Sequence, residues 1–339
     1  MSAMFPEISP DPEEKPALIG IAKMAAQGVL LDEGHKVEYH EISNRSVLAR
    51  CKSTRVPFAW MINPYRGCEF ACKYCYARYT HEFMELRDSL DFERKIYVKQ
   101  HTAWLLRQEL KKVKRGEEIA IGSATDPYQP AERRFGVTRA IMEELARHRG
   151  LDMGMVTKSD LILRDLDVLQ EVSRNNGFMV CVTVTTTGTE LARKMEPRAP
   201  RPDLRLKALK KLVEAGIYAG VNCSPVLPGI TDSPAELEKV VKAAGEVGAK
   251  FVHAGGLFLK PCAMSVFMPF LEEHFPKLVP MYKQRYARSA FLPAEYQRSI
   301  SVIVKKLCEK HGVVSVRKPV ASVDEVVRRY GAQQMRLFG

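Results

Sequence analysis

This 339-residue sequence has no long apolar run and no recognisable leader segment, and it has fewer acidic than basic residues. No apolar run reaches 18 residues, so no stretch is expected to cross a membrane as a helix. The first six residues lack the basic-then-apolar order of a signal peptide, and the sequence therefore predicts a cytoplasmic protein without a membrane partner. Only 40 Asp and Glu face 52 Lys and Arg, a net charge of +12. This excess favours nucleic acid as a partner, although a basic protein need not have one.

Cysteine is also sparse, and its placement is uneven. Of eight cysteines, three stand close together as Cys68, Cys72 and Cys75, with the spacing Cys-x3-Cys-x2-Cys. Soft thiolates at such spacing bind zinc, copper or an iron–sulfur cluster. A closed zinc site needs four ligands, and His81 is the nearest candidate for the fourth. A [4Fe–4S] cluster held by three cysteines instead leaves one iron open, and we favour this interpretation over a zinc-stapled loop.

Short apolar runs alternate with helical patterns along most of the chain. Alternation of this kind predicts right-handed βαβ units around a parallel sheet, and six units predict a partial (β/α)6 barrel in an α/β fold. One helix has a marked start, with Ser233 as its N-cap and Pro234 at its first position. The expected strands lie in 56–63, 119–122, 153–156, 178–184, 218–222 and 250–254, and the clearest helices in 100–114, 137–149 and 203–215.

Three segments are expected. Residues 1–36 form an N-terminal extension, disordered at its proline-rich, acidic start. Residues 37–264 form the core with its lead-in, which includes an accessory strand at 37–42. Residues 265–339 form a helical segment with a basic tail. That tail and the arginines of 133–139 are the candidate sources of a nucleic-acid contact.

Polar side chains follow the expected strands. Because the carboxyl ends of parallel strands meet at one mouth of a barrel, these side chains should converge there. Together these loops supply a cation, hydrogen-bond acceptors and hydroxyl groups. They read Ser123-Ala124-Thr125-Asp126-Pro127, Thr157-Lys158-Ser159, Thr185-Thr186-Thr187 with Glu196-Pro197-Arg198, and Ser224-Pro225.

The cysteine spacing with an aromatic residue before the last cysteine, here Tyr74, resembles the signature of the radical S-adenosylmethionine (SAM) enzymes. The groups of the strand-end loops are those that a SAM site needs. That resemblance implies that a cluster iron chelates SAM and that an electron splits it into methionine and a 5′-deoxyadenosyl radical. It also implies an external electron donor of the flavodoxin or ferredoxin type. Further motifs look like the spore photoproduct lyase-like branch, many of whose members are named DNA repair photolyases. These motifs are Pro64-Tyr65-Arg66-Gly67-Cys68, residues 125–130, 157–159 and 196–198.

The resemblance and the strand-end groups together assign the site. Lys158 and Arg198 are expected to hold the SAM carboxylate, and Ser123 and Ser159 to contact its polar groups. The full set of expected SAM contacts is Tyr74, Ser123, Thr125, Asp126, Lys158, Ser159, Thr185 and Arg198, with Cys68, Cys72 and Cys75 as cluster ligands.

One departure from that branch concerns the hydrogen donor. Spore photoproduct lyase carries a donor cysteine near the end of its second strand, where this chain has no cysteine in 119–124. Repair of a thymine dimer by that route is therefore not expected. Cys223, at the end of the fifth strand, is the candidate donor here, and its alternative is a small buried apolar residue.

Three functions follow from these observations. The first is a radical SAM enzyme that abstracts hydrogen from a substrate, with nucleic acid the favoured class. The second is the same chemistry on a peptide or small molecule, with the charge incidental. The third is a non-catalytic, metal-stapled nucleic-acid-binding protein, which would not need the polar strand-end groups.

The cysteine spacing generates the first testable prediction. Protein reconstituted without oxygen should hold about four irons per chain and a brown absorbance that dithionite bleaches. Replacing Cys68, Cys72 or Cys75 with alanine should remove both, because each thiolate holds one corner of the cluster. Iron and sulfide analysis measures this, with Cys308→Ala as the matched control; a colourless protein with one zinc per chain would contradict it.

Overall fold

The structure, a computed structural model, describes residues 18–34 and 36–315. Its centre is a seven-stranded sheet in the order β11-β10-β9-β8-β7-β4-β3. The six strands from β11 to β4 are parallel, and β3 pairs antiparallel with β4 at one edge. Their bounds are β3 Leu48–Arg50, β4 Trp60–Ile62, β7 Glu118–Ile121, β8 Asp152–Thr157, β9 Gly177–Thr183, β10 Tyr218–Val226 and β11 Val252–Gly256.

This sheet confirms the predicted α/β fold. Six parallel strands lie where six were expected, and among the described strands β11 and β3 do not pair, so the barrel is partial. The first predicted strand is shorter than expected, since residues 56–59 precede β4. Pro57, which has no amide hydrogen to donate to a ladder, lies in that stretch.

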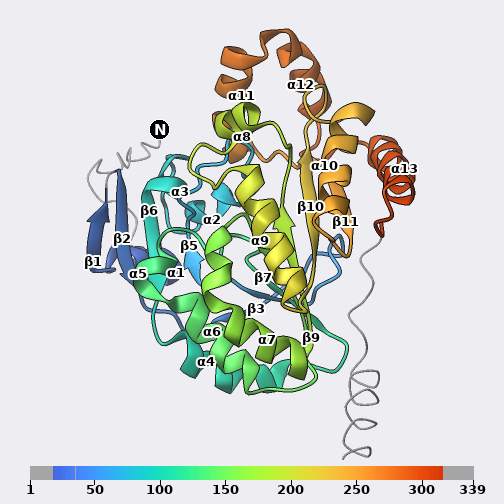
Figure 1. The fold of residues 1–339 in the computed structure, drawn as a ribbon. Helices are drawn as coiled ribbons and strands as arrows, with labels where there is room; N and C mark the ends of the chain where they lie inside the picture. The colour runs from blue at the N-terminus through green and yellow to red at the C-terminus, as the bar shows by residue number, and fades with distance from the viewer. Residues whose placement is uncertain (1–17, 35, 316–339) are drawn as a thin grey trace, which may run out of the picture.

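Helices cover one face of the sheet (Figure 1). Their apolar side chains meet every second residue of the strands, so Val180 and Val182 of β9 lie in the main core. The alternate residues, such as Cys181 and Thr183, line a pocket on the opposite face. The covering helices are α4 Thr102–Glu109, α6 Val137–Ala146, α7 Leu166–Asn175, α9 Pro202–Glu214, α10 Pro234–Glu246 and α13 Ala294–Lys310.

Local sequence sets the ends of these helices. The Ser233 hydroxyl accepts a hydrogen bond from the Glu236 amide at 3.2 Å, which confirms Ser233 as the N-cap of α10. Pro202 and Pro234 occupy first-turn positions, where no amide hydrogen is needed. Gly216, just after α9, has φ of +81°, a conformation in which glycine avoids a steric penalty.

A smaller, four-stranded sheet lies beside the barrel, in the order β1-β2-β6-β5. Its strands are β1 Leu30–Gly34, β2 Val37–Ile42, β6 Lys95–Lys99 and β5 Tyr65–Arg66. The predicted accessory strand at 37–42 is β2. The short helix α1 Gly20–Ala26 packs on this sheet through Ala25, which meets Ile42 and Tyr97. Because β5 leads directly into Cys68, the small sheet holds the start of the cysteine loop, residues 67–75.

The chain after β11 is helical, as predicted. It forms α11 Pro261–His274, the 3-10 turn η4 Pro276–Leu278, α12 Val279–Tyr286 and α13. The predicted segment boundary at 264/265 falls inside α11. Phe267 of α11 and Tyr282 of α12 share a second core with Phe70 and Tyr74 of the cysteine loop. The predicted disordered start (1–16) and the basic residues from Arg317 onward lie outside the described residues, within which no helix is long and apolar enough to span a membrane.

Candidate active site

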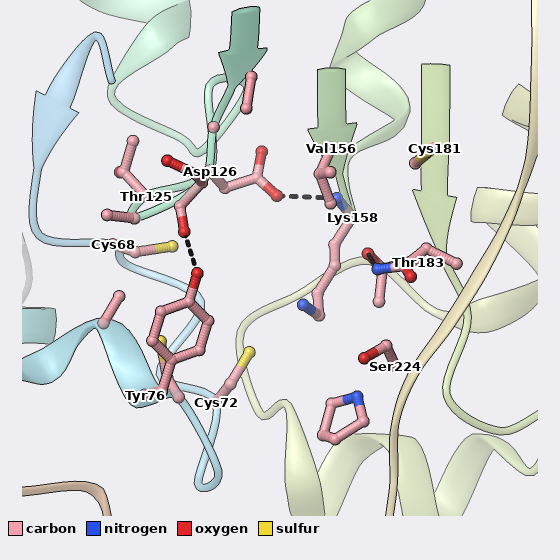
Figure 2. Close-up of a pocket in the computed structure, with 18 of the residues that line it drawn as sticks. Cys68, Cys72, Tyr76, Thr125, Asp126, Val156, Lys158, Cys181, Thr183 and Ser224 are labelled. Carbon is pink, nitrogen blue, oxygen red and sulfur yellow. Dashed lines mark hydrogen bonds between the residues drawn. The ribbon is translucent and has the colours of Figure 1, made fainter. Parts of the chain in front are cut away.

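A pocket of about 350 Å³ lies at the carboxyl ends of the parallel strands. All three clustered cysteines line it, together with Lys158 from the end of β8. Figure 2 shows the thiols of Cys68 and Cys72 and the ammonium of Lys158 pointing into the same space. Thr183 of β9 and Ser224 of β10 line the facing wall. The strand ends and the cysteine loop are therefore brought together, as the sequence predicted.

The backbone is tightly packed at the start of the cysteine loop, and this packing requires glycine at position 67. Gly67 has φ of +87°, and a side-chain carbon there would lie 2.8 Å from the Phe92 carbonyl oxygen and 2.9 Å from that of Lys95. The Cys68 amide donates to the same Phe92 oxygen at 2.9 Å. Any larger residue at position 67 would push the backbone of the first cysteine away from this contact.

Residues 122–130 follow β7, the second parallel strand of the barrel along the chain, and are here called the strand-two loop. This loop holds the cysteine loop in place. The Thr125 hydroxyl and the Gln129 amide group both donate to the Gly67 carbonyl oxygen, at 2.5 and 3.1 Å. Gln129 also accepts from the Glu69 amide at 3.0 Å, and the Glu69 carboxylate in turn accepts from the Ala131 amide at 2.7 Å. Polar groups of the strand-two loop thus replace water around the cysteine-loop backbone.

Asp126 fastens the opposite side of the strand-two loop. Its carboxylate accepts from the Thr157 hydroxyl and from the Lys158 amide, each at 2.7 Å, and from the Tyr128 amide at 2.9 Å. Burial raises the pKa of Asp126 above its usual range, while these hydrogen bonds oppose the rise. Asp126 therefore sets where the end of β8, and with it Lys158, lies.

Lys158 is the one basic side chain that lines the pocket within the described parts of the chain. Its ammonium lies 5.7 Å from the centre of the Tyr74 ring. Burial lowers the pKa of Lys158, but the electrostatic influence of Cys72, Glu196 and Asp126 outweighs burial and leaves the pKa above its usual value. Lys158 therefore presents a positively charged ammonium to the cysteine loop.

A buried ion pair supports the far side of the cysteine loop. Glu196 and Arg205 lie 2.5 Å apart, and both are almost fully buried. The hydroxyls of Tyr74 and Thr185 donate to the same Glu196 carboxylate. Arg205 also donates to the Thr183 carbonyl oxygen at 3.2 Å, so the ion pair ties the cysteine loop to β9. The sequence analysis noted Glu196 but missed Arg205, which stands nine residues later.

The three clustered thiols are soft ligands of the kind that fit an iron–sulfur cluster or a single thiophilic metal ion. Burial raises the pKa of Cys72 to about 12 and that of Cys68 well above its usual value, so a metal would have to displace both protons. No group of three Cys, His, Asp or Glu side chains in residues 18–34 and 36–315 is arranged to hold one metal ion. His81 does not line the pocket, and its ring contacts the Lys95 carbonyl oxygen at 3.0 Å.

The expected site residues divide into two groups. Eight of them line the pocket: Cys68, Cys72, Tyr74, Cys75, Ser123, Thr125, Asp126 and Lys158. Four do not: Ser159, Thr185, Arg198 and Cys223.

Three of these four side chains make hydrogen bonds within the protein. The Ser159 hydroxyl accepts from the Leu161 amide and caps the 3-10 turn η3 Asp160–Asp165. The Thr185 hydroxyl donates to the Glu196 carboxylate, as described above. Arg198 donates to a backbone carbonyl at 3.4 Å and lines a separate small cavity.

Cys223, the expected hydrogen donor, lies on the helix-facing side of β10. It is 2% exposed and packs in the main core with Val221, whereas Asn222 and Ser224 line the pocket. Alternation along the strand is the reason, because successive side chains point to opposite faces. The cysteine outside the loop that does line the pocket is Cys181 of β9.

Two aromatic side chains that line the pocket, Tyr76 and Phe258, contact two further rings, Tyr79 and Phe291. These four residues are here called the aromatic rim. Phe258 and Phe291 stack with ring centres 4.3 Å apart, and Tyr76 lies 5.6 Å from Phe258. Two cations cover this rim, with the Arg55 guanidinium 4.0 Å from the Phe291 ring centre and the Lys260 ammonium 3.5 Å from that of Tyr79. Nothing in the sequence pattern indicated the rim, because its members lie up to 215 residues apart, from Tyr76 to Phe291.

Residues 62–256, more than half of the chain, match the radical SAM superfamily. The chain belongs to this superfamily. An uncharacterized protein of Mycobacterium tuberculosis is 32% identical over 311 residues, which cover 91% of each chain. An uncharacterized protein of Methanocaldococcus jannaschii is 30% identical over 242 residues, covering 70% of this chain and 85% of the relative.

The fold is also similar to that of a radical SAM enzyme of known structure. Spore photoproduct lyase complexed with dinucleoside spore photoproduct superposes with a TM-score of 0.62, covering 89% of this chain and 85% of the lyase. A mutant of that lyase with bound AdoMet and the same ligand gives 0.60. Identity is 14% in both cases, so the similarity shows the fold alone. It bears out the resemblance to the spore photoproduct lyase-like branch at the level of the fold.

The position of Asp126 generates the second prediction. Asp126→Asn should lower the free energy of unfolding by about 1–3 kcal/mol, because an amide cannot accept hydrogen bonds through both of its heavy atoms. Urea unfolding under anaerobic conditions measures this. The control, Asp203→Asn, loses a surface ion pair with Arg201 and should change stability by less than about 1 kcal/mol. Equal losses in the two variants would contradict the assigned role of Asp126.

Proposed function

We propose that the protein is a radical SAM enzyme in which Cys68, Cys72 and Cys75 hold a [4Fe–4S] cluster and the pocket binds SAM at the open iron. When bound, the cluster supplies the electron that splits SAM into methionine and a 5′-deoxyadenosyl radical, which abstracts hydrogen from the substrate. The observation that carries the proposal is that all three cysteines and the ammonium of Lys158 line one pocket at the strand ends.

The chain's own residues supply the binding groups. In this proposal Lys158 binds the SAM carboxylate, which is supported by its charge lying in the same space as the thiols. Thr183, Asn222 and Ser224 line the facing wall and offer hydroxyl and amide partners to the ribose and the ammonium of SAM. Tyr74 presents its ring to the pocket while its hydroxyl is held by Glu196. These fixed groups orient SAM without rearrangement of the site.

Each cleavage consumes one electron, so the proposal includes an external one-electron donor of the flavodoxin or ferredoxin type. Such a donor must approach the cysteine loop closely. Cys68 and Cys75 are partly exposed, whereas Cys72 is buried. We infer that electrons enter from the side on which Cys68 or Cys75 is accessible.

The proposed substrate class is nucleic acid, engaged through its bases. Flat bases stack on aromatic side chains, and cations beside the rings add to this attraction. The aromatic rim offers such a surface at the pocket, and the net charge of +12 favours a polyanion. Spore photoproduct lyase, with a similar fold, binds a dinucleoside photoproduct. No cysteine stands in 119–124, so the proposal names the substrate class and not that lesion.

The arginines proposed from sequence contribute unequally. Arg139 forms ion pairs with Glu143, Asp165 and Asp167, at 2.9, 3.1 and 2.8 Å, so its charge is largely neutralised. Arg133 is exposed. The aromatic rim, with Arg55 and Lys260, is the better supported contact surface.

SAM binding and cleavage test the proposed cofactor site. The dithionite-reduced protein should form 5′-deoxyadenosine slowly even without substrate, and Cys72→Ala should form none. Lys158→Ala should keep its iron and weaken SAM binding by about tenfold to a hundredfold, since a charged hydrogen bond contributes about 1.5–3 kcal/mol. Equilibrium dialysis measures the affinity, with Lys250→Ala as control, since Lys250 is an exposed lysine two residues before β11. Unchanged SAM affinity in Lys158→Ala would contradict the assignment of Lys158 to the SAM carboxylate.

The aromatic rim tests the substrate class. Phe291→Ala should weaken binding of a short single-stranded oligonucleotide by about 1–3 kcal/mol, because the Arg55 guanidinium, which packs on the Phe291 ring, loses the support that holds it at the rim. Fluorescence anisotropy at several salt concentrations measures this, and phosphate contacts should make the affinity fall as salt rises. Trp104→Ala removes an aromatic residue that is 61% exposed on α4 and should have no effect. Absence of salt-sensitive binding to any nucleic acid would favour the peptide or small-molecule alternative.

A further inference from the structure

A second cavity, of about 570 Å³, lies beside the four-stranded sheet. Residues of α1, the turn after β2, β5 and β6 line it, and it shares no lining residue with the active-site pocket. We call it the basic cavity. Its lining residues are Gly20, Ile21, Lys23, Met24, Gln27, Ile42, Asn44, Arg45, Ser46, Arg66 and Lys99.

The charge in the basic cavity is of one sign. Four cationic side chains line it, Lys23, Arg45, Arg66 and Lys99, and no Asp or Glu does. Within the described part of the chain, none of the four has a carboxylate oxygen within 4 Å, although most other buried or half-buried charges of this protein are paired. Crowding like charges without a counter-charge is unfavourable unless an anion completes the set.

Several polar atoms of the basic cavity have no hydrogen-bond partner. The amide nitrogen and oxygen of Asn44 and the Nε of Arg66 are buried and unpartnered. Burial, with the charge of Arg66, lowers the pKa of Lys99 to about 7, and Glu109 opposes this only in part. Buried polar groups in native proteins are normally satisfied, so unpartnered donors around one cavity point to a missing ligand.

We propose that the basic cavity binds a phosphate group. The planar guanidinium of Arg66 presents paired N–H donors that match phosphate oxygens, the Asn44 amide adds further donors, and the Lys99 ammonium supplies charge. The volume exceeds that of inorganic phosphate, so there is room for more of the molecule that bears it. The bearer is either a free phosphorylated small molecule or the terminal phosphate of a nucleic-acid chain.

The proposal places a ligand close to the cysteine loop. Arg66 belongs to β5 and stands two residues before Cys68, while Tyr65 and Arg66 pair with β6, which carries Lys99. A phosphate held between Arg66 and Lys99 would therefore bridge the two strands that lead into and support the loop. The site is separate from SAM binding, and its test does not depend on catalysis.

Thermal unfolding of the anaerobically purified, cluster-containing protein tests the proposal, with pyrophosphate as the probe and chloride at equal ionic strength as the reference. Pyrophosphate at about ten times its dissociation constant should raise the melting temperature by about 2 °C. Lys99→Met should reduce affinity at least tenfold, and its ligand-free form should melt no lower than the parent, because like-charge crowding is relieved. Asn44→Asp should abolish binding by adding a negative charge.

Lys305→Met is the matched control, since Lys305 is exposed on α13 and lies outside the basic cavity. No pyrophosphate response in the parent beyond that of chloride overturns the proposal, as does equal affinity in the Lys99 and Lys305 variants. A comparison of binding between a dinucleotide with a 5′-phosphate and one without it identifies the molecule that carries the phosphate. Tighter binding of the phosphorylated form, lost in Lys99→Met, assigns the site to a chain end, and equal binding of the two assigns it to free phosphates.

Discussion

The buried carboxylate of Asp126 is the group on which the active-site geometry depends. It accepts hydrogen bonds from the end of β8, while Thr125 and Gln129 of the same loop hold the backbone of the cysteine loop. Three separate segments are therefore joined through the strand-two loop. A buried carboxylate is tolerated only when its lone pairs are satisfied, so the network is favourable in essentially one arrangement. Rigid placement of Lys158 relative to the thiols follows from it.

The open barrel explains where the pocket lies. Alternate side chains of each strand face the helices and form the main core, and the remaining ones face a space that no helix of the outer layer fills. Small residues on that face, such as Ala120 and Gly154, leave room for a ligand. The cysteine loop and the helices α11 and α12 cover the carboxyl end of this space and pack together through a second core. The aromatic rim adjoins this space through Tyr76 and Phe258.

Sequence patterns predicted the architecture more fully than the site. Six parallel strands, the N-cap Ser233, the cysteine loop and Lys158 were all readable, because periodicity, capping and motif spacing are local signals. Ser159, Thr185 and Arg198 were not placed correctly in relation to the pocket, since a hydroxyl or guanidinium at a strand end serves a backbone group or a ligand equally well. Cys223 was misplaced for a different reason. Cys223 stands two and four residues after Val221 and Ala219, so alternation along the strand already placed it on the core-facing side of β10. The aromatic rim depends on tertiary contacts alone.

The cysteine loop draws its support from distant parts of the chain, and this has a consequence for how the protein matures. The loop backbone is held by Gln129, the Lys73 amide donates to the Met195 carbonyl oxygen, and Tyr74 is held by Glu196. About 120 residues beyond Cys75, as far as Glu196, must therefore be synthesised before the loop can make these contacts. The three thiols thus reach their final arrangement only when much of the core has already folded.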